Sequence, residues 1–496
     1  MTKIIIRNVV TELQDFPGHL LKELSKRASY LKDTSVRYRG TEEGGWDGYY
    51  RFLRVPKVKN PYLPTGLRNI AVHLLQQNDI PFEIVDLRVA PELTKSEYPE
   101  IPLYDYQKEA VEFLVSSPDV ILDASPRSGK TRCMFEVVRR LNLPTIWLAP
   151  TNGIVDQTVR AGREFFRESD CVRTSNKFQE DHVDALLTVC TSAGALHLPE
   201  SFWKSRQCLV IDEFHHCTQD GAVGKCISQN TKHIYHRKGA TGTMFRSGDD
   251  SIALLATISN LGYTINSKRL LELGRLVPCK SVFIDSGVDS IRCDSNRWNG
   301  PNGFGTVGIT ECTERNTMAA TAAKHLSDNG YSVIILVATK KQGYYIRDML
   351  KETFPPTSDQ HEFEHVEFVS TDRRKHHVGK VLESFVNHQE VKILIGTSII
   401  GEGTDLPPAD ALVYASGGKA AVGYYQALYR VATTYGDKSH AVVVDFSDQH
   451  HKKLLAHSRK RWHYQSIDPV FECEYLNNAN DFFGWVEAIK SVTPTE

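Results

Sequence analysis

The chain has 496 residues, of which 41% are hydrophobic and 24% charged, and its formal net charge at pH 7 is −1. These values are ordinary for globular proteins, so the length predicts several domains and the charge gives no global argument for a nucleic-acid partner. The ten cysteines include no CxxC pair, which favours buried thiols in a reducing compartment over a zinc knuckle or a disulfide framework. No apolar run approaches the roughly 18 residues of a membrane span, and the N-terminus is too charged for a signal peptide. We therefore expect a cytoplasmic protein with no membrane partner.

Residues 1–91 are predicted to form a small N-terminal substrate-binding domain, followed by a linker over residues 92–103. Between residues 22 and 59 there are ten Lys or Arg and five Asp or Glu, with aromatic residues interleaved. Basic side chains attract phosphates, and aromatic rings can stack on exposed bases. The alternative is an ordinary β-rich domain with a solvated basic face and the tryptophan in its core. The predicted nucleic-acid-binding residues here are Arg37, Arg39, Trp46, Arg51 and Arg54.

Two groups of apolar, β-branched runs follow, and helical patterns separate the runs. The first group is 120–124, 145–149, 186–190 and 208–212, and the second is 332–338, 366–370, 392–396, 411–415 and 441–446. Near-continuous apolar strands separated by helices are typical of parallel sheets covered on both faces. The predicted fold class is therefore α/β, with tandem parallel-sheet domains at 104–275 and 276–448.

Residues 449–496 are predicted to form a short, basic, helical C-terminal extension. The stretch QHHKKLLAHSRKRWHYQSI (449–467) has five Lys or Arg and no acidic residue. Such a helix is either a solvated surface or a face that lies along a nucleic-acid duplex, and the sequence leaves both open.

The segment VILDASPRSGKTRCMF (120–135) contains a predicted strand, a turn and the start of a helix. This context is typical of a phosphate-binding loop, in which backbone N–H groups hold phosphates, a lysine neutralises the β and γ oxygens, and a hydroxyl binds Mg²⁺. The general pattern has a glycine at the position that Ala124 occupies here. The predicted nucleotide-binding residues of this loop are Arg127, Ser128, Gly129, Lys130 and Thr131.

The stretch LVIDEFHHC (209–217) has two carboxylates followed by two imidazoles. In a nucleotide hydrolase with a phosphate loop, an aspartate at a strand end holds Mg²⁺ and a neighbouring glutamate orients the attacking water. We predict these roles for Asp212 and Glu213, with Thr131 and Asp212 as the Mg²⁺ ligands. A transition-metal site would require histidines four residues apart on a helix or a third soft ligand. The adjacent His215 and His216 do not meet that requirement, so we favour the site for ATP and Mg²⁺.

The order of these motifs resembles that of superfamily 2 helicases over about residues 100–446. YDYQKEAV resembles the Q-motif, ASPRSGKT motif I, DEFH motif II, and IGTSIIGEGTDLP (395–407) motif V, while GATGT (239–243) stands in place of motif III with Gly242 for the usual alanine. The resemblance implies two RecA-like motor domains that bind ATP between them. It also implies that Gln107 contacts adenine, that His215 couples the ATP site to motif III, and that Gly403 and Asp405 face the nucleotide.

Four further threonines fall in motifs that contact the nucleic-acid backbone in this family. LAPT (148–151) resembles motif Ia, CTSAG (190–194) motif Ib and ILVATKKQG (335–343) motif IV. The residues that the resemblance assigns to nucleic-acid contact are Thr151, Thr191, Thr339 and Thr397.

Motif VI departs from the family pattern Gln-x-x-Gly-Arg-x-x-Arg, because this chain has QALYRVAT. Gln426 and Arg430 match, whereas Tyr429 replaces the glycine and Thr433 replaces the second arginine. Such an arginine can contribute about 10³ to 10⁵ in turnover. Two hypotheses follow: Arg430 acts alone as the catalytic arginine, or the protein is an ATP-gated nucleic-acid-binding factor with weak or no hydrolysis.

VRYRGTEEGGWDGYYRFLRV and the later LPTGL, within residues 36–67, resemble the N-terminal module of phage branch-migration helicases of the UvsW type. This resemblance depends on Trp46, Asp47, Gly48, Pro64, Gly66 and Leu67. It implies a monomeric DNA helicase of repair and recombination, in a host cytoplasm, that acts on forks, junctions or D-loops and also contacts single-stranded DNA. An RNA helicase is disfavoured, because motifs II and III have neither the DEAD nor the Ser-Ala-Thr form.

Overall fold

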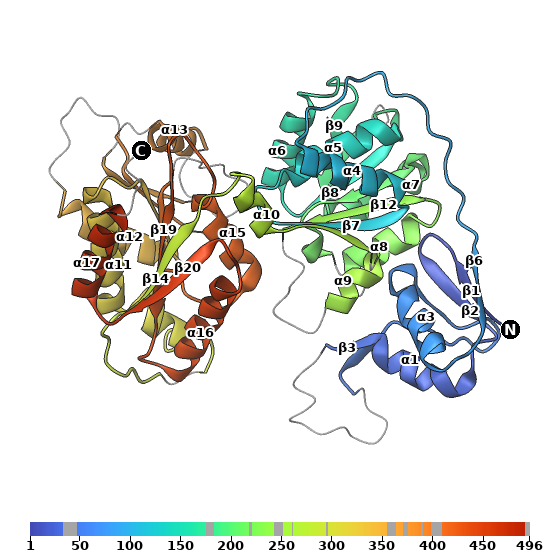
Figure 1. Cartoon of the computed structure of the whole chain (residues 1–496), viewed down its shortest axis with the longest axis horizontal. Coiled ribbons are helices and arrows are strands. Elements are labelled where there is room, and N and C mark those ends of the chain that lie inside the picture. The colour runs from blue at the N-terminus through green and yellow to red at the C-terminus, as the bar shows by residue number, and fades with distance from the viewer. Residues whose placement is uncertain are drawn as a thin grey trace. The chain divides into compact units, whose positions relative to one another are not determined.

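The computed structural model describes residues 1–32, 47–174, 183–217, 221–242, 251–259, 261–293, 296–354, 364–370, 375–387, 390–397 and 409–491. The chain divides into two compact units, Met1–Ile265 and Asn266–Glu496 (Figure 1). Residues 266–275, which the sequence places at the end of the first motor domain, are part of the second unit. The hydroxyl of Ser267 donates to Asp468 at 2.9 Å, and Leu276 forms a β-bridge with Thr433.

The N-terminal module of the first unit is a small α+β structure, as predicted. Its main sheet has the order β5-β2-β1-β6, in which β1 pairs parallel with β6 and the other pairs are antiparallel. Alternate residues of β1 are buried, so Ile4 and Ile6 face the core. The elements are β1 (Thr2–Ile6), β2 (Val10–Gln14), η1 (Gly18–Leu20), α1 (Leu21–Arg27), β3 (Ser29–Leu31), β4 (Tyr49–Arg51), β5 (Tyr62–Pro64), η2 (Thr65–Leu67), α3 (Arg68–Gln77) and β6 (Phe82–Asp86).

The N-terminal module packs on helix α9 (Ser251–Thr257) of the same unit. Its core contains Ala253 and Ala256 of α9 beside Leu67. A Cβ atom at Gly66 would lie 1.9 Å from the carbonyl oxygen of Leu255, so the backbone of η2 reaches this helix only because residue 66 is glycine. The glycine of the PTGL sequence is therefore a contact residue between the module and the motor domain.

Polar side chains also join the module to the motor domain. The fully buried guanidinium of Arg237 donates to the carbonyl oxygens of Asn8 and Thr257, both at 2.8 Å. Arg68 of the module donates to the buried carboxylate of Asp119 at 2.7 Å. Because removal of one partner would leave a buried charge or carbonyl unpaired, these contacts fix the module against the motor domain.

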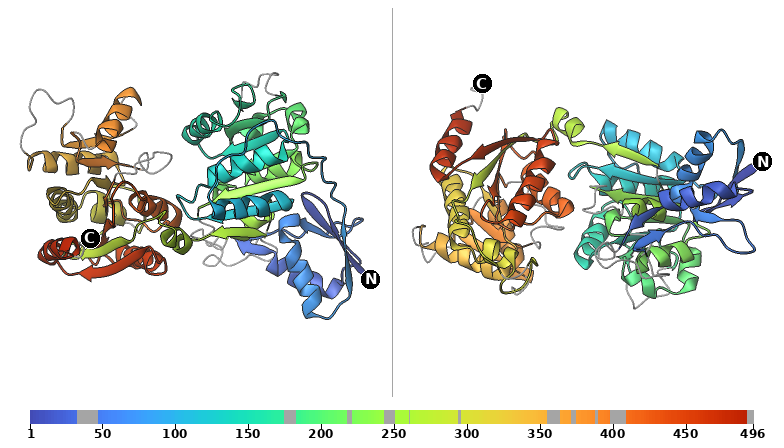
Figure 2. Two further views of the ribbon diagram at one scale, coloured as in Figure 1. Left: turned by 45° about the horizontal axis from the view of Figure 1, so that its top comes forward. Right: turned by 90° about the horizontal axis from the view of Figure 1, so that it is seen from below.

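The first motor domain contains a seven-stranded parallel sheet with the order β13-β7-β12-β11-β8-β10-β9. Its strands are β7 (Asp119–Ala124), β8 (Thr145–Ala149), β9 (Cys171–Arg173), β10 (Leu187–Thr191), β11 (Cys208–Ile211), β12 (His236–Thr241) and β13 (Gly262–Ile265). The helices are α4 (Asp105–Ser116), α5 (Lys130–Leu141), α6 (Asn152–Gly162), η4 (Gly194–His197), α7 (Glu200–Ser205), η5 (Phe214–His216), α8 (Ala222–Asn230) and α9. Helices cover both faces of the sheet (Figures 1 and 2), as the apolar runs predict.

The second unit contains a seven-stranded parallel sheet with the order β16-β17-β15-β18-β19-β14-β20. Its strands are β14 (Cys279–Asp285), β15 (Val333–Leu336), β16 (Val366–Val369), β17 (Ile393–Gly396), β18 (Ala411–Tyr414), β19 (Ala441–Ser447) and β20 (Phe471–Leu476). The helices are α10 (Ser267–Glu272), η6 (Thr306–Thr310), α11 (Thr313–Asp328), α12 (Lys340–Lys351), α13 (Lys375–Val386), α15 (Ala421–Val431), α16 (Lys452–Ser466) and α17 (Ala479–Ser491). Helices α11, α12 and α17 lie on one face of the sheet, and α15 and α16 lie on the other (Figure 1).

The predicted C-terminal extension contains the helices α16 and α17, and it also contains a strand that the sequence patterns do not indicate. Strand β20 pairs in parallel with β14, and Phe482, Trp485 and Val486 of α17 lie in the core of the second unit. The extension therefore completes the second motor domain.

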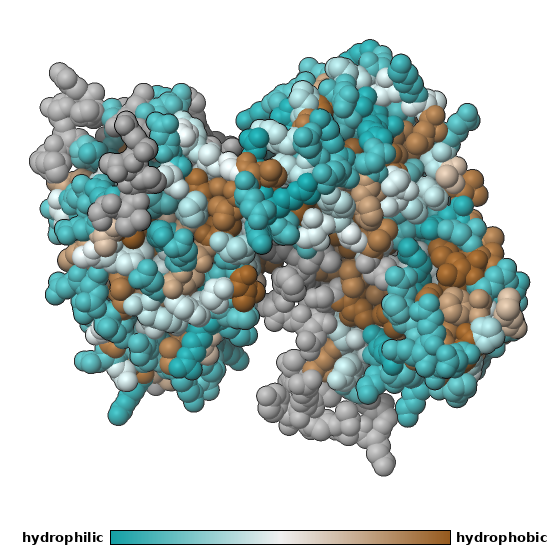
Figure 3. Space-filling model, in the orientation of Figure 1, coloured by the Kyte–Doolittle hydropathy of each residue, from teal (hydrophilic) through white to brown (hydrophobic). Residues whose placement is uncertain are grey.

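The surface that faces the viewer in Figure 3 is mostly hydrophilic, with apolar residues in several separate patches, one of them over the N-terminal module at the right. Exposed apolar side chains of that module include Ile84, Leu87 and Val89. Among the helices that the structure describes, none has the length and apolar character that crossing a bilayer requires.

Candidate active site

The phosphate loop connects the end of β7 to the start of α5. The N–H of Ser128 donates to the carbonyl of Ser125 at 3.2 Å, which closes a turn. Gly129 then caps α5 with φ +81°, a left-handed conformation that favours glycine. A Cβ atom at Gly129 would also lie 2.2 Å from Nε2 of Gln107. Both constraints explain why glycine directly precedes the helix.

Gln107 joins helix α4 to the phosphate loop. Its Oε1 accepts the N–H of Tyr104 at 3.0 Å, and its Nε2 donates to the carbonyl of Ser128 at 2.9 Å. The hydroxyl of Tyr106 donates to the same carbonyl at 3.2 Å. Beyond these two bonds, the amide of Gln107 has one N–H and one lone pair left for a ligand. The contact of Gln107 with adenine stays a prediction.

Motifs I, II and III lie at one edge of the first sheet. Strands β7, β12 and β11 are parallel neighbours, so their carboxyl ends meet at the same edge. The ammonium of Lys130 donates to the carbonyl of Ala124 at 3.2 Å, and a Cβ atom at Gly242 would lie 3.0 Å from its Nζ. The glycine that replaces the usual alanine in motif III therefore gives the lysine its space.

Asp212 and Glu213 follow β11 at this edge. Asp212 is buried, and its Oδ1 accepts the N–H of Glu213 at 2.9 Å. Burial raises the pKa of Asp212, the neighbouring Glu213 raises it further, and the ammonium of Lys130 opposes both effects. Glu213 has φ +44°, which is uncommon for a residue other than glycine and costs on the order of 1 kcal/mol. The carboxylate of Asp212 thus lies within electrostatic reach of the lysine, and the strained turn brings that of Glu213 to His215.

His215 connects motif II to motif III. Its Nδ1 lies 3.0 Å from the hydroxyl of Thr241 and 3.3 Å from Oε2 of Glu213. The imidazole is buried. His215 therefore lies between Glu213 and the end of β12, and its coupling role stays a prediction.

Asp123 is a further, partly buried carboxylate near Lys130, which the sequence motifs do not indicate. It is the penultimate residue of β7, and burial raises its pKa to about 6 while Lys130 opposes the shift. The signal for it was a single carboxylate in the apolar run VILDA, directly before the phosphate loop.

The residues at this edge fit a nucleotide with Mg²⁺. The hydroxyl of Ser128 is fully buried and has no hydrogen-bond partner among the described residues, as expected for a group whose partner is a ligand. Thr131 and Asp212 supply the hard oxygen ligands that Mg²⁺ prefers. Within the described ranges, no group of three or more His, Cys, Asp or Glu side chains is arranged to hold a metal ion by itself.

The predicted nucleic-acid contacts of the first unit lie at the carboxyl edge of the same sheet. Thr151 follows β8 and Thr191 ends β10, and these two strands are neighbours. The Thr151 hydroxyl accepts the N–H of Ile154 at 3.4 Å and caps α6, and the Thr191 hydroxyl accepts the N–H of Gly194 at 3.0 Å. Their contact with nucleic acid stays a prediction.

The corresponding pair in the second unit has the same arrangement. Thr339 follows β15 and caps α12, where its hydroxyl accepts the N–H of Gln342 at 3.2 Å. Thr397 directly follows β17, the neighbour of β15. Gly403 and Asp405 lie outside the described residues.

Two of the five predicted contacts in the N-terminal module can be placed. Arg51 forms an ion pair with Asp47 and lies over the ring of Tyr49, and this pair lowers the pKa of Asp47 to about 2. Arg54 is exposed, with its guanidinium over the ring of Tyr50. Arg51 is thus partly neutralised, whereas Arg54 has a phosphate-accessible position. Residues 37, 39 and 46 fall outside the described ranges.

Motif VI lies on α15, where Arg430 is buried and Gln426 is half-buried. The hydroxyl of Tyr429 donates to Asp468 at 2.6 Å, and the hydroxyl of Thr433 donates to the carbonyl of Tyr429 at 3.3 Å. The tyrosine that replaces the family glycine therefore anchors α15 to the segment that precedes β20.

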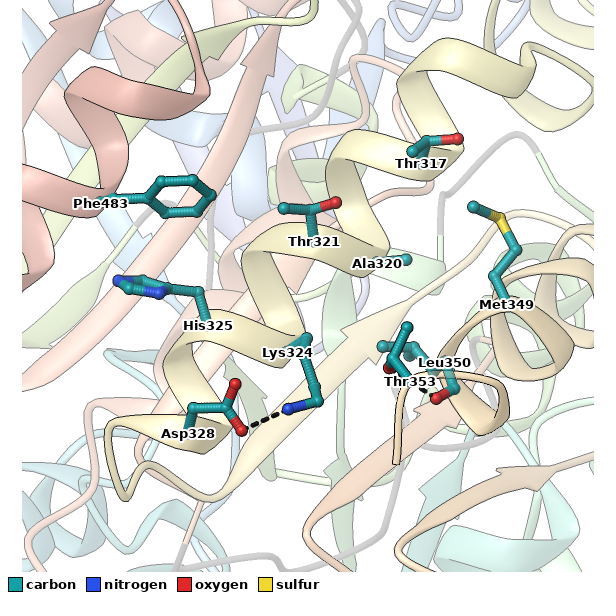
Figure 4. Close-up of a pocket in the computed structure, with 10 residues that line it drawn as sticks. All are labelled: Thr317, Ala320, Thr321, Lys324, His325, Asp328, Met349, Leu350, Thr353 and Phe483. Atoms are coloured by element: carbon teal, nitrogen blue, oxygen red, sulfur yellow. Dashed lines mark hydrogen bonds and ion pairs between the residues drawn. The ribbon is translucent and has the colours of Figure 1, made fainter. Parts of the chain in front are cut away.

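A cavity of about 370 Å³ lies between α11, α12 and α17 of the second unit (Figure 4). Lys324 and Asp328 form an ion pair in its wall, and Phe483 borders it from α17. None of the residues that line this cavity belongs to the predicted site.

Two family models match the chain. The model described as "Type III restriction enzyme, res subunit" matches residues 100–246, and the model described as "Helicase conserved C-terminal domain" matches residues 317–433. Together these matches cover more than half of the chain. The protein belongs to the superfamily 2 helicases, and it has their two motor domains.

Three solved structures illustrate the similarity. Bacteriophage T4 UvsW has 18% identity over 96% of this chain and 99% of its own, with a TM-score of 0.45. The type ISP restriction-modification enzyme LlaBIII bound to DNA has 13% identity over 85% of this chain and 35% of its own, with a TM-score of 0.55. Dbp5 of S. cerevisiae bound to RNA and ADP BeF3 has 17% identity over 79% of this chain and 93% of its own, with a TM-score of 0.51. No curated protein matches the sequence.

Proposed function

We propose that this protein is an ATP-dependent DNA helicase or translocase that remodels branched DNA, such as forks, junctions and D-loops. One observation carries the ATPase part of the proposal: Lys130, the carboxylates after β11 and motif III meet at the carboxyl edge of the first sheet. The 3.0 Å separation between Lys130 Nζ and a Cβ atom at Gly242 supports the approach of the lysine to motif III, and its effect on the pKa of Asp212 supports its approach to the carboxylates.

In this proposal the side chains have separate roles in hydrolysis. The N–H groups at the start of α5 and Lys130 hold the phosphates, and Thr131 and Asp212 hold Mg²⁺, which neutralises phosphate charge when bound. Glu213 orients the attacking water, and Arg430 from the second unit stabilises the charge that develops on the γ-phosphate.

The same geometry offers a route from ATP to motif III. Loss of the γ-phosphate removes a group beside Glu213, and His215 contacts both that carboxylate and Thr241. A nucleotide can shift a conformational equilibrium only through different contacts in its two states. The linked contacts of His215 with Glu213 and Thr241 are the contacts that would differ between the two nucleotide states.

DNA is the proposed substrate for reasons that lie in the N-terminal module. The similar structures include one bound to DNA and one bound to RNA, and at their low identity they support the fold alone. The module resembles that of phage branch-migration helicases in its aromatic and basic stretch and in the PTGL sequence, whose Gly66 contacts α9. That contact concerns packing, so branched duplex DNA, single-stranded DNA as a further ligand and a monomer as the active species are proposed from the sequence resemblance of the module.

A second candidate function is an ATP-gated DNA-binding factor with weak hydrolysis. The observation that favours it is Thr433, which follows α15, donates its hydroxyl to the carbonyl of Tyr429 in that helix, and carries no charge for a phosphate. Restoring the family residue in Thr433→Arg separates the candidates. A large gain in turnover would favour the slow binder, whereas vigorous wild-type turnover would remove this alternative.

The decisive experiment compares ATPase stimulation by fork, four-way junction, duplex, single-stranded DNA and RNA. We expect forks and junctions to stimulate most, and Lys130→Ala to lose nucleotide-driven unwinding while it still binds DNA. Unwinding by Lys130→Ala, or stimulation by RNA alone, would refute the proposal.

A further inference from the structure

The described parts of the segment between β14 and η6, residues 287–293 and 296–305, are held against helix α16. The N–H of Ile291 donates to the carbonyl of His450 at 3.1 Å, and the ammonium of Lys453 donates to the carbonyl of Asn296 at 2.9 Å. A Cβ atom at Gly308 would lie 2.4 Å from Cδ1 of Leu454. Two segments about 150 residues apart in the sequence thus form one surface.

Aromatic rings complete the contact between the segment and the helix. Trp298 packs against Phe304 with ring centroids 5.5 Å apart and against His457 at 5.6 Å. Phe304 stacks on His451 at 5.5 Å, and the ammonium of Lys453 lies over its ring at 5.3 Å. Because these rings contact one another, their role is to hold the segment rather than to stack on unpaired bases.

Lysine and arginine side chains lie on the solvent-exposed side of helix α16 and of the segment packed against it. Lys452, Arg459 and Lys460 of α16 are exposed, and their spacing of seven and eight residues places them on one helix face. Arg292 and Arg297 are exposed on the adjoining segment. We call these five residues the basic surface.

The cations of the basic surface differ from other cations of the same helix. Arg461 is fully buried in ion pairs with Asp445 and Asp448, so it belongs to the core. Among the described residues, by contrast, Lys452, Arg459 and Lys460 form no ion pair. Burial and nearby cations lower the pKa of His457 to about 4, so the ring is neutral at pH 7 and the charge comes from Lys and Arg.

The basic surface begins at the sheet edge that carries the predicted nucleic-acid contacts. The 287–305 segment follows β14 and α16 follows β19, so both start at the carboxyl edge of the second sheet. Thr339 follows β15 at that edge, three strands away from β14 in the sheet order. At about 4.8 Å per strand, the separation is about 14 Å, well within the reach of one duplex.

We propose that the basic surface binds the phosphate backbone of double-stranded DNA and extends the contact made at Thr339 and Thr397; this inference rests on the proposed function. Charge complementarity selects a polyanion, and the mutually packed rings favour a duplex over a single strand, which is bound through exposed aromatic platforms.

The test measures the affinity of the full chain for a short blunt duplex over a range of salt concentrations. The variant is Lys452→Gln/Arg459→Gln/Lys460→Gln, and the control is Lys268→Gln/Lys351→Gln/Lys490→Gln, which removes equal charge from α10, α12 and α17. The salt slope is the slope of log K against log[salt], and each lost phosphate contact lowers its magnitude by about 0.9. We therefore expect this magnitude to fall by up to about 3 in the helix variant and not to change in the control. Arg292→Gln/Arg297→Gln is expected to lose up to about 2. Basal ATPase activity without DNA should remain at the wild-type level in every variant.

The outcomes separate this inference from the proposed function. A helix variant with the control's affinity and salt slope would overturn the basic surface as a DNA site, even where DNA stimulates wild-type ATPase. Wild-type protein that binds RNA duplex in preference to DNA would overturn the assignment to DNA. Wild-type protein that neither binds DNA nor hydrolyses ATP would refute the proposed function as well.

Discussion

The groups assigned to the nucleotide at the first carboxyl edge and those assigned to nucleic acid at the second differ in how deeply they are buried. At the first edge, Ser128 is fully buried, and Asp212 and His215 are buried. At the second edge, the threonine that caps α12 and the first lysine of α16 are exposed. Charges interact strongly where water is excluded and weakly where it is not. The first edge is therefore suited to chemistry on a bound phosphate, and the second to reversible contact with a solvated polyanion.

The largest effect is expected from Glu213→Gln at the first edge. Glutamine keeps the size of the side chain but cannot orient and deprotonate water as a carboxylate does, so turnover should fall by about 10³. ATP affinity should change little, since the phosphates are held by the loop. Steady-state ATPase activity and ATP titration of the same preparations measure the two quantities.

Asp123→Asn provides the matched control, because it removes another carboxylate beside Lys130 to which hydrolysis assigns no role. Its turnover should stay within about tenfold of wild type, a difference of about 1.4 kcal/mol. Equal losses in the two variants would mean that the edge responds to total charge and that Glu213 has no special role.

The next effect concerns stability and the strand that carries motif III. Lys238 of β12 is fully buried, and its ammonium donates to the carbonyls of Ser117 and Pro118. Burial lowers the pKa of Lys238 from 10.5 to about 8. Below pH 8, Lys238 is charged in the folded protein, and the full free-energy cost of burying this charge lowers the stability. Between pH 8 and 10.5 the unfolded chain binds more protons, so this residue makes the free energy of unfolding rise with pH, by up to about 3 kcal/mol.

Lys238→Met removes this titration. The other lysines and tyrosines titrate in the same way in both proteins. The informative quantity is therefore the difference between the two unfolding free energies, measured with denaturant at pH 7.5 and at pH 10. We expect the free energy of unfolding of the wild type to rise relative to that of the variant as pH rises. A difference that is constant across this range would show that Lys238 titrates normally.

The same strand shows where sequence patterns suffice for the fold and where they do not. Strands β7, β8, β10 and β11 each contain a run of apolar residues and were predicted, because both faces of a parallel sheet are covered. Strand β12 has the sequence HRKGAT and is equally buried, but its cationic side chains donate hydrogen bonds to backbone carbonyls that are distant in sequence. Only the tertiary structure supplies those acceptors. Strand β20, FECEYL, was missed because it has polar residues on the exposed edge of its sheet.

The candidate site shows a similar division. Motif order predicted that Lys130, Asp212 and His215 act together, and parallel strand ends explain why they meet. Local patterns could not explain the substitutions at Gly242 and Tyr429, since their reasons are the ammonium of Lys130 and the carboxylate of Asp468.

Gly242→Ala probes the first of these substitutions. The added methyl group would lie 3.0 Å from Lys130 Nζ, closer than ordinary contact, so the lysine must move by a few tenths of an ångström. Displacement of a positioned catalytic group by a fraction of an ångström should reduce kcat/KM for ATP by about tenfold, or about 1.4 kcal/mol. Gly262→Ala is the control, because its methyl group would meet only the carbonyl of Ile121 at 3.5 Å. Equal activity of Gly242→Ala and wild type would show that Lys130 has ample room.

The smallest effect is expected at the second edge, from Thr339→Ala. The hydroxyl of Thr339 caps α12 by accepting the N–H of Gln342, and loss of such a cap costs about 1 kcal/mol of stability. Because neither the hydroxyl nor the N–H of this cap titrates, the cost should be independent of pH. The residue is exposed, so DNA affinity should fall only a few-fold. Thr339→Ser keeps the hydroxyl and should restore both quantities, as measured by denaturant unfolding and duplex binding. If serine restored stability but not DNA affinity, the methyl group would be needed at this edge, and contact through exposed hydroxyls alone would be the wrong account of it.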